Sequence, residues 1–196
     1  MTIASDAMLI LASTSRYRRA LLERLQIPFA VEAPDVDETP LESEAPDALA
    51  ARLSRAKALK VANENPDALV LGSDQVASCG PLLLHKAGSV PKAVQQLSSC
   101  SGKTVTFATG VVLARGEQTL EERVVSTSVT FRTLDEQTLQ RYAERDKPLD
   151  CAGSFRWEGL GIALFEKIQS DDPTALEGLP LISVTEMLGR HGISVL

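Results

Sequence analysis

The first segment that could carry out chemistry lies near the N-terminus, where a short apolar run leads into a cluster of arginines. Residues 11–19 read Leu-Ala-Ser-Thr-Ser-Arg-Tyr-Arg-Arg, so three cations fall in or near the first turn of a predicted helix. Each cation there costs about 0.3–1 kcal/mol unless an anion compensates it, because a helix N-terminus is already partly positive. Backbone amides, small hydroxyls and arginines together suit phosphate. We interpret the segment as a phosphate site; the alternative is a solvated basic turn whose arginines pair with nearby acids.

Two acidic segments follow strand-like runs. Asp35-Val36-Asp37-Glu38 comes after the strand-like segment 29–33, and Gly72-Ser73-Asp74-Gln75 comes after the apolar run 68–71. Carboxylates at strand ends are typical ligands of Mg²⁺ or Mn²⁺ when the substrate carries phosphates. An aspartate in such a place can also accept a proton from water. The alternatives are an acidic surface loop for the first segment and a polar turn for the second.

A fourth segment, residues 151–161, contains three glycines but matches neither the dinucleotide-binding nor the Walker pattern. Glycines permit tight turns and close approach of the backbone to a ligand. The segment alone therefore predicts only an ordered loop.

The composition restricts the classes of protein that remain. The chain has 196 residues and a formal net charge of −6, which argues against a protein that coats nucleic acid but not against a local cationic pocket. No apolar run approaches the roughly 20 residues of a membrane span, and residues 1–7 do not resemble a secretory signal. Three widely spaced cysteines without a C-x-x-C pair indicate a reducing, cytoplasmic location and only a packing role. They are Cys79, Cys100 and Cys151.

Strand-like and helix-like patterns interleave along the whole chain, which predicts an α/β protein with a mixed sheet. Strands are expected at 8–12, 29–33 and 68–71, with a long hairpin around Gly116 from the alternating runs near 104–107 and 125–131. Helices are expected at 15–26, 47–63, 92–100, 135–145 and 180–190. We expect one domain over residues 8–196, with residues 1–7 as an N-terminal extension.

The joint occurrence of these segments resembles the Maf family of nucleotide pyrophosphatases. The matching motifs extend from about residue 9 to residue 188. They are Leu9-Ile10-Leu11-Ala12-Ser13, Arg18-Arg19, Val36-Asp37-Glu38, Ala56-Lys57-Ala58, Gly72-Ser73-Asp74, Ser101-Gly102, Thr109-Gly110, Ala152-Gly153 and Gly178-Leu179-Pro180.

The resemblance implies cleavage of a nucleoside triphosphate between its α and β phosphates, with a divalent cation (Mg²⁺ or Mn²⁺) as cofactor. It implies an elongated mixed sheet with flanking helices and two lobes around a central cleft, an architecture like that of inosine triphosphatases. Dimers are common in the family, so a homodimer is an expected assembly, with neither nucleic acid nor a membrane as partner. By motif, Asp74 corresponds to the general base that activates water, and Glu38 with Asp74 to the metal carboxylates. The implied phosphate contacts are Ser13, Arg18, Lys57 and Lys86.

Three positions resemble the branch of the family that acts on 7-methyl-GTP, namely Tyr17, Gln75 and Glu158. The 7-methylguanine base is cationic, so an aromatic face can stack on it with a cation–π contribution of about 0.5–2 kcal/mol. A carboxylate can accept hydrogen bonds from the N1–H and N2–H groups of guanine. The alternatives are a dTTP or UTP pyrophosphatase of the same family and a nucleotide-binding regulator of septation that does not hydrolyse its ligand.

The chain departs from the family pattern at two places, beside Tyr17 and beside Lys86. Arg16 stands where proline is usual, and Tyr17 where this branch usually has tryptophan. His85 and Ala87 replace the usual glycine and proline around Lys86. The loop that presents this lysine therefore lacks the two residue types that favour turns.

Overall fold

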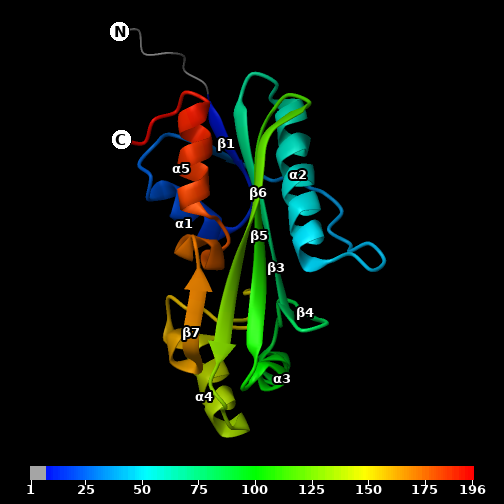
Figure 1. Cartoon of the computed structure of the whole chain (residues 1–196), viewed down its shortest axis with the longest axis vertical. Coiled ribbons are helices and arrows are strands. Elements are labelled where there is room, and N and C mark those ends of the chain that lie inside the picture. Colours follow the sequence, from blue (N-terminus) through cyan, green and yellow to red (C-terminus); the bar gives the residue numbers. More distant parts are fainter. Residues whose placement is uncertain (1–7) are drawn as a thin grey trace. The chain divides into compact units, whose positions relative to one another are not determined.

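The computed structural model describes residues 8–196, which divide into two compact units (Figure 1). The predicted N-terminal extension, residues 1–7, lies outside the described residues. The first unit comprises residues up to 74, 109–125 and 172–196, and the second comprises 75–108 and 126–171. No helix within residues 8–196 is both long and apolar enough to span a membrane.

A mixed seven-stranded sheet confirms the predicted α/β class. The strand order is β2-β1-β3-β5-β6-β7, with β4 beside β3. Strands β2 and β3 both run parallel to β1, whereas β4 is antiparallel to β3 and β7 to β6. The strands are β1 (Leu9–Ala12), β2 (Ala30–Glu32), β3 (Leu69–Cys79), β4 (Leu82–Leu84), β5 (Thr104–Arg115), β6 (Gln118–Phe131) and β7 (Phe165–Ser170).

Helices cover both faces of the sheet in the first unit (Figure 1). Successive side chains of a strand point to opposite faces. Leu9 and Leu11 of β1 accordingly pack with α1 (Arg16–Glu23) and α5 (Leu181–Arg190), whereas Ile10 and Ala12 pack with α2 (Pro46–Glu64). Burial on both faces explains why β1 is a continuous apolar run rather than an alternating one. A short 3₁₀ helix, η2 (Pro173–Glu177), precedes α5.

The second unit has an aromatic core. Phe107, Phe131, Phe155 and Phe165 form edge-to-face pairs with ring centroids 4.7–5.5 Å apart. Helix α3 (Val90–Cys100) packs against α4 (Glu136–Asp146), and the 3₁₀ helix η1 (Leu160–Leu164) leads into β7. Burial beside Cys79 raises the pKa of the Cys100 thiol to about 12, so this free thiol is unreactive at neutral pH.

The predicted end of the third strand is wrong. Gly72-Ser73-Asp74 is expected to close the strand after residue 71, but β3 continues through it to Cys79. The residues beyond Asp74 are mostly buried, and 77–79 pair with β4, so burial and pairing prevail over the local turn signal. The hairpin around Gly116 is confirmed, whereas β4 and β7 were not anticipated.

Candidate functional site

Helix α1 begins where the phosphate site was predicted. Ser15 caps the helix, and its side-chain oxygen accepts a hydrogen bond from the Arg18 amide at 3.4 Å. The buried Ser13 hydroxyl oxygen accepts one from the Ser15 amide at 3.1 Å. The first turn contains no acidic side chain that would neutralise the helix terminus. The local geometry therefore favours an anion at this end of α1.

The Arg18 side chain contacts the segment that precedes α5. Its Nε donates to the carbonyl oxygen of Gly178 at 2.8 Å. Burial lowers the pKa of the Arg18 guanidinium, and the nearby carboxylates of Asp74 and Glu38 raise it in opposition. An arginine guanidinium keeps its charge in proteins, so Arg18 acts as a cation here.

Lys57 joins the two carboxylates that the resemblance implied as metal ligands. Its Nζ lies 2.5 Å from Asp74 Oδ1 and 2.6 Å from Glu38 Oε1. Lys57 and Asp74 are buried, at 6% and 8% exposure, whereas 60% of the Glu38 side chain is exposed. Together with Arg18 they form a cluster of two cations and two anions, which we call the mixed-charge cluster.

Close packing of α2 on the sheet places Lys57 beside Asp74. A Cβ atom at Gly72 would collide with Ser54 and Ala58 of the helix, and one at Gly110 would collide with Ala50 and Ser54. These two glycines therefore let the helix backbone approach the strands. Lys57 follows Ser54 by three residues, so the two side chains lie on the same face of α2.

Ser54 connects α2 directly to the backbone of Asp74. The Asp74 amide donates to Ser54 Oγ at 2.8 Å, and the Ser54 hydroxyl donates to the Ala50 carbonyl at 2.6 Å. All these groups are buried, so the Asp74 amide has no access to water as a substitute partner. Ser54 was not among the predicted site residues.

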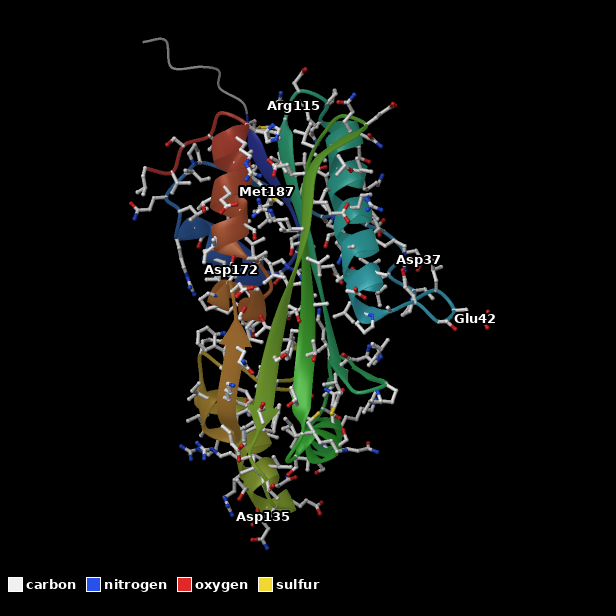
Figure 2. All side chains as sticks on the ribbon, viewed as in Figure 1. Asp37, Glu42, Arg115, Asp135, Asp172 and Met187 are labelled. Atoms are coloured by element: carbon white, nitrogen blue, oxygen red, sulfur yellow. The ribbon has the colours of Figure 1, made fainter. Side chains whose placement is uncertain are left out.

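The segment before α5 also helps to hold the site in place, through the carbonyl group of Gly178. Gly178 has φ = +105°, which a side chain would strain, and its carbonyl oxygen lies 2.9 Å from Ser73 Oγ as well as accepting from Arg18. Asp172 fixes this segment, because its Oδ2 accepts from the Ile182 amide at 2.8 Å and its Oδ1 from the Thr174 hydroxyl at 2.7 Å. Figure 2 shows Asp172 close to the start of α5.

Tyr17 lies on α1, half-buried, with a cation already beside its ring. The Arg16 guanidinium carbon is 4.8 Å from the ring centroid, and Arg16 Nη2 donates to the Tyr17 hydroxyl at 2.8 Å. The residue that departs from the family pattern therefore contacts the predicted stacking residue. The contact is a cation–π interaction at a partly exposed position.

The remaining predicted residues belong to the second unit. Gln75 follows Asp74 along β3 and is half-buried, whereas Lys86 and Glu158 are exposed. Lys86 forms a β-bridge with Ala152, so its segment lies beside the glycine-containing loop.

The loop that presents Lys86 is fixed by a glutamine rather than by glycine and proline. Gln96 Oε1 accepts from the His85 amide at 3.0 Å, and Gln96 Nε2 donates to the His85 carbonyl at 2.9 Å. The same Nε2 donates to Ser154 Oγ at 2.6 Å. Gln96 thus joins the Lys86 segment to the glycine-containing loop.

The carboxylates fit a divalent cation that arrives with a phosphate ligand. Within residues 8–196, no group of three or more His, Cys, Asp or Glu side chains is placed to hold a metal. Glu38 and Asp74 supply two carboxylates, and both contact the ammonium group of Lys57. Mg²⁺ commonly binds through one or two carboxylates and takes its other ligands from water and substrate phosphates.

Comparison with known proteins gives the family. Residues 8–191 match the family model described as Maf-like protein. The chain belongs to the Maf-like family. A protein of Nitrosococcus oceani named 7-methyl-GTP pyrophosphatase is 51% identical over 96% of this chain and 95% of its own length. One of the same name from Aromatoleum aromaticum is 51% identical over 94% of this chain and 96% of its own. Among solved structures, the Staphylococcus aureus Ham1 protein covers 64% of this chain and 71% of its own, with a TM-score of 0.41 and 17% identity, too distant to inform the site.

In this Maf-like chain, four of the predicted residues lie together in the mixed-charge cluster. They are Arg18, Glu38, Lys57 and Asp74. Ser13 lies just before α1 in the same unit, whereas Gln75, Lys86 and Glu158 belong to the other. Sequence reasoning missed Ser54, Gln96 and Asp172, because each acts through a hydrogen bond to a distant segment. Of these three residues, only Ser54 could have been noticed in the sequence, as a hydroxyl at a buried position of a predicted helix.

Replacing Ser54 with alanine is expected to lower kcat for nucleotide hydrolysis about tenfold and to leave KM nearly unchanged. The Asp74 amide loses its partner in a buried place, which costs about 1–3 kcal/mol of stability. Steady-state kinetics and urea unfolding measure the two effects. Ser183→Ala is the control, since it removes another buried helical hydroxyl that is not hydrogen-bonded to Asp74. Equal kinetic effects of the two substitutions would contradict a specific role for Ser54.

Proposed function

We propose that this chain hydrolyses the bond between the α and β phosphates of 7-methyl-GTP, giving 7-methyl-GMP and pyrophosphate, and so removes a modified nucleotide. The observation that carries the proposal is the mixed-charge cluster, in which Asp74 lies 2.5 Å from Lys57 within a protein of the Maf-like family. The names of the relatives support the choice of substrate.

The cluster offers the groups that this reaction needs. Asp74 is mostly buried and carries a carboxylate that can accept a proton from the attacking water. Lys57 and Arg18 can hold phosphate oxygens, with Ser13 and Lys86 as further proposed contacts. These cations would also stabilise the negative charge that develops on the phosphates as the bond breaks.

Charge balance gives a physical reason for a divalent cation. Lys57 is shared by the Glu38 and Asp74 carboxylates, and both also act on Arg18. The four formal charges sum to zero, so the cluster alone offers little net attraction to a triphosphate. A Mg²⁺ or Mn²⁺ held by Glu38 and Asp74 would supply charge neutralisation and orientation of the phosphates. Lys57 and Arg18 would then be available to the phosphate oxygens.

A panel of nucleotides tests the substrate. Pyrophosphate release is measured from 7-methyl-GTP, GTP, UTP and dTTP, with Mg²⁺ or Mn²⁺ and with EDTA. We expect the highest kcat/KM for 7-methyl-GTP and no release in EDTA. Equal values for UTP and 7-methyl-GTP would remove the branch assignment. Binding without release from any nucleotide would favour the regulator of septation.

The proposed base-reading residues give a further prediction. The double variant Tyr17→Arg with Glu158→Gln is expected to shift preference from 7-methyl-GTP toward UTP and dTTP by at least tenfold. Arginine removes the aromatic face that stacks on the cationic base, and glutamine replaces an acceptor-only carboxylate by an amide. The ratio of the kcat/KM values measures the shift. An unchanged ratio would mean that these positions do not read the base.

A further inference from the structure

The loop that carries Glu158 is fixed at its start by a partly buried ion pair in the second unit. Arg156 Nη2 lies 2.6 Å from Asp146 Oδ1, and the same nitrogen donates to the Asp146 carbonyl at 2.8 Å. The Asp146 side chain is only 6% exposed, and that of Arg156 is 30% exposed. The guanidinium thus contacts both the side chain and the backbone at the end of α4.

Tyr142 completes this network. Its hydroxyl donates to Asp146 Oδ2 at 2.9 Å and accepts from the Arg156 amide at 3.0 Å. Burial raises the pKa of the Tyr142 hydroxyl above its ordinary value, so it remains a donor at neutral pH. Asp146, Arg156 and Tyr142 are called the loop clamp below.

The backbone on both sides of Glu158 contacts the loop clamp. The Arg156 carbonyl accepts from the Gly159 amide at 3.2 Å and from the Gly161 amide at 3.0 Å. A Cβ atom at Gly159 would lie 3.1 Å from Asp146 Oδ1, so the chain passes directly over the carboxylate. Glu158 itself is exposed, between these two fixed points.

The placement of the acid argues for a role beyond stability. Asp146 is the last residue of α4, where the helix dipole disfavours a negative charge. A buried ion pair is also often no more stabilising than apolar residues of similar size, although removing one partner is costly. Stability therefore does not explain an aspartate at this position, whereas its contact with Arg156 does.

We propose that Asp146 and Arg156 are positioning residues that fix the backbone around Glu158 and thereby set the preference for the 7-methylguanine base. The inference rests on the proposed function, because it assumes that Glu158 reads the base. The proposed role of Asp146 and Arg156 involves neither binding of the phosphates nor activation of the attacking water. Loss of the clamp should therefore change KM for the base-selective substrate more than kcat.

Asp146→Asn tests the proposal, because asparagine keeps the shape but removes the charge that holds Arg156. We expect the ratio of kcat/KM for 7-methyl-GTP over UTP to fall at least tenfold, mainly through KM, with kcat within threefold. Hydrogen exchange at the amides of Gly159 and Gly161 should accelerate at least tenfold. Arg145→Gln, at the exposed neighbouring position of α4, is the control and should change neither value by more than twofold.

A second variant keeps the test decisive should Asp146→Asn not fold. Tyr142→Phe removes only one hydroxyl from the clamp and is expected to lower the same ratio about threefold. Unchanged selectivity in a folded variant with accelerated exchange would overturn the inference, as would unchanged exchange. Failure of the unsubstituted protein to prefer 7-methyl-GTP would instead contradict the proposed function, and the exchange measurement would still report on the clamp.

Discussion

Replacing Asp74 with asparagine is expected to lower kcat for pyrophosphate release by about 10³-fold, because general-base catalysis typically contributes about 10²–10⁴-fold. Asparagine keeps the size of the side chain and the backbone hydrogen bond to Ser54, so the fold should persist. Lys57 loses one carboxylate partner but retains Glu38. The measurement is pyrophosphate release with saturating 7-methyl-GTP and Mg²⁺, together with a thermal melt that verifies folding.

Asp37→Asn is the matched control for this substitution. Asp37 belongs to the acidic segment that carries Glu38, but it is exposed (Figure 2). Its Oδ1 accepts from the Thr39 amide at 2.9 Å. We expect its kcat to stay within twofold of the unsubstituted protein. If Asp74→Asn retained more than a tenth of the activity, the base would have to be another group.

Replacing Lys57 with methionine is expected to have the second largest effect. Methionine fills the space of the lysine stem but leaves the buried Asp74 carboxylate without its closest cation. We expect kcat to fall about 10²-fold, in the range that mutagenesis gives for loss of one group that stabilises developing charge. KM should rise because a proposed phosphate contact is lost. Stability should fall by about 3–5 kcal/mol, the cost of breaking a buried ion pair.

Lys60→Met separates this effect from a general loss of charge on α2. Lys60 lies three residues further along the helix and pairs with Glu64 at an exposed position. Exposed pairs of this kind contribute about 0.3–0.5 kcal/mol. Kinetics and urea unfolding of the two variants should therefore differ clearly. Comparable losses of activity would show that Lys57 acts only through the overall charge of the helix.

The sequence predicted the elements whose patterns are local. The apolar run at β1, the helical spacing of α2 and the hairpin at Gly116 all depend on residues close together in the chain. The extent of β3 was predicted wrongly, because Gly72 looks like part of a turn when only its neighbours are considered. In the structure this glycine provides room for Ser54 and Ala58 of α2, a requirement that arises from packing at long range.

The candidate site likewise combines features that follow from local sequence with features that depend on long-range packing. The type of chemistry followed from arginines at a helix start and carboxylates after strands. That Lys57 lies between Glu38 and Asp74 could not be worked out from spacing, because it depends on how α2 packs on β3. The loop clamp was invisible for a similar reason. Asp146 next to a lysine at a helix end resembles a solvated acid until the fold brings Arg156 against it.

The most direct test of the central claim is to identify the products that the unsubstituted protein forms from 7-methyl-GTP with Mg²⁺. The account predicts 7-methyl-GMP and pyrophosphate in equal amounts, and no product in EDTA. It also predicts that the Asp74→Asn variant forms the same products about 10³-fold more slowly. Formation of 7-methyl-GDP and inorganic phosphate, or binding of 7-methyl-GTP without any cleavage, would contradict it.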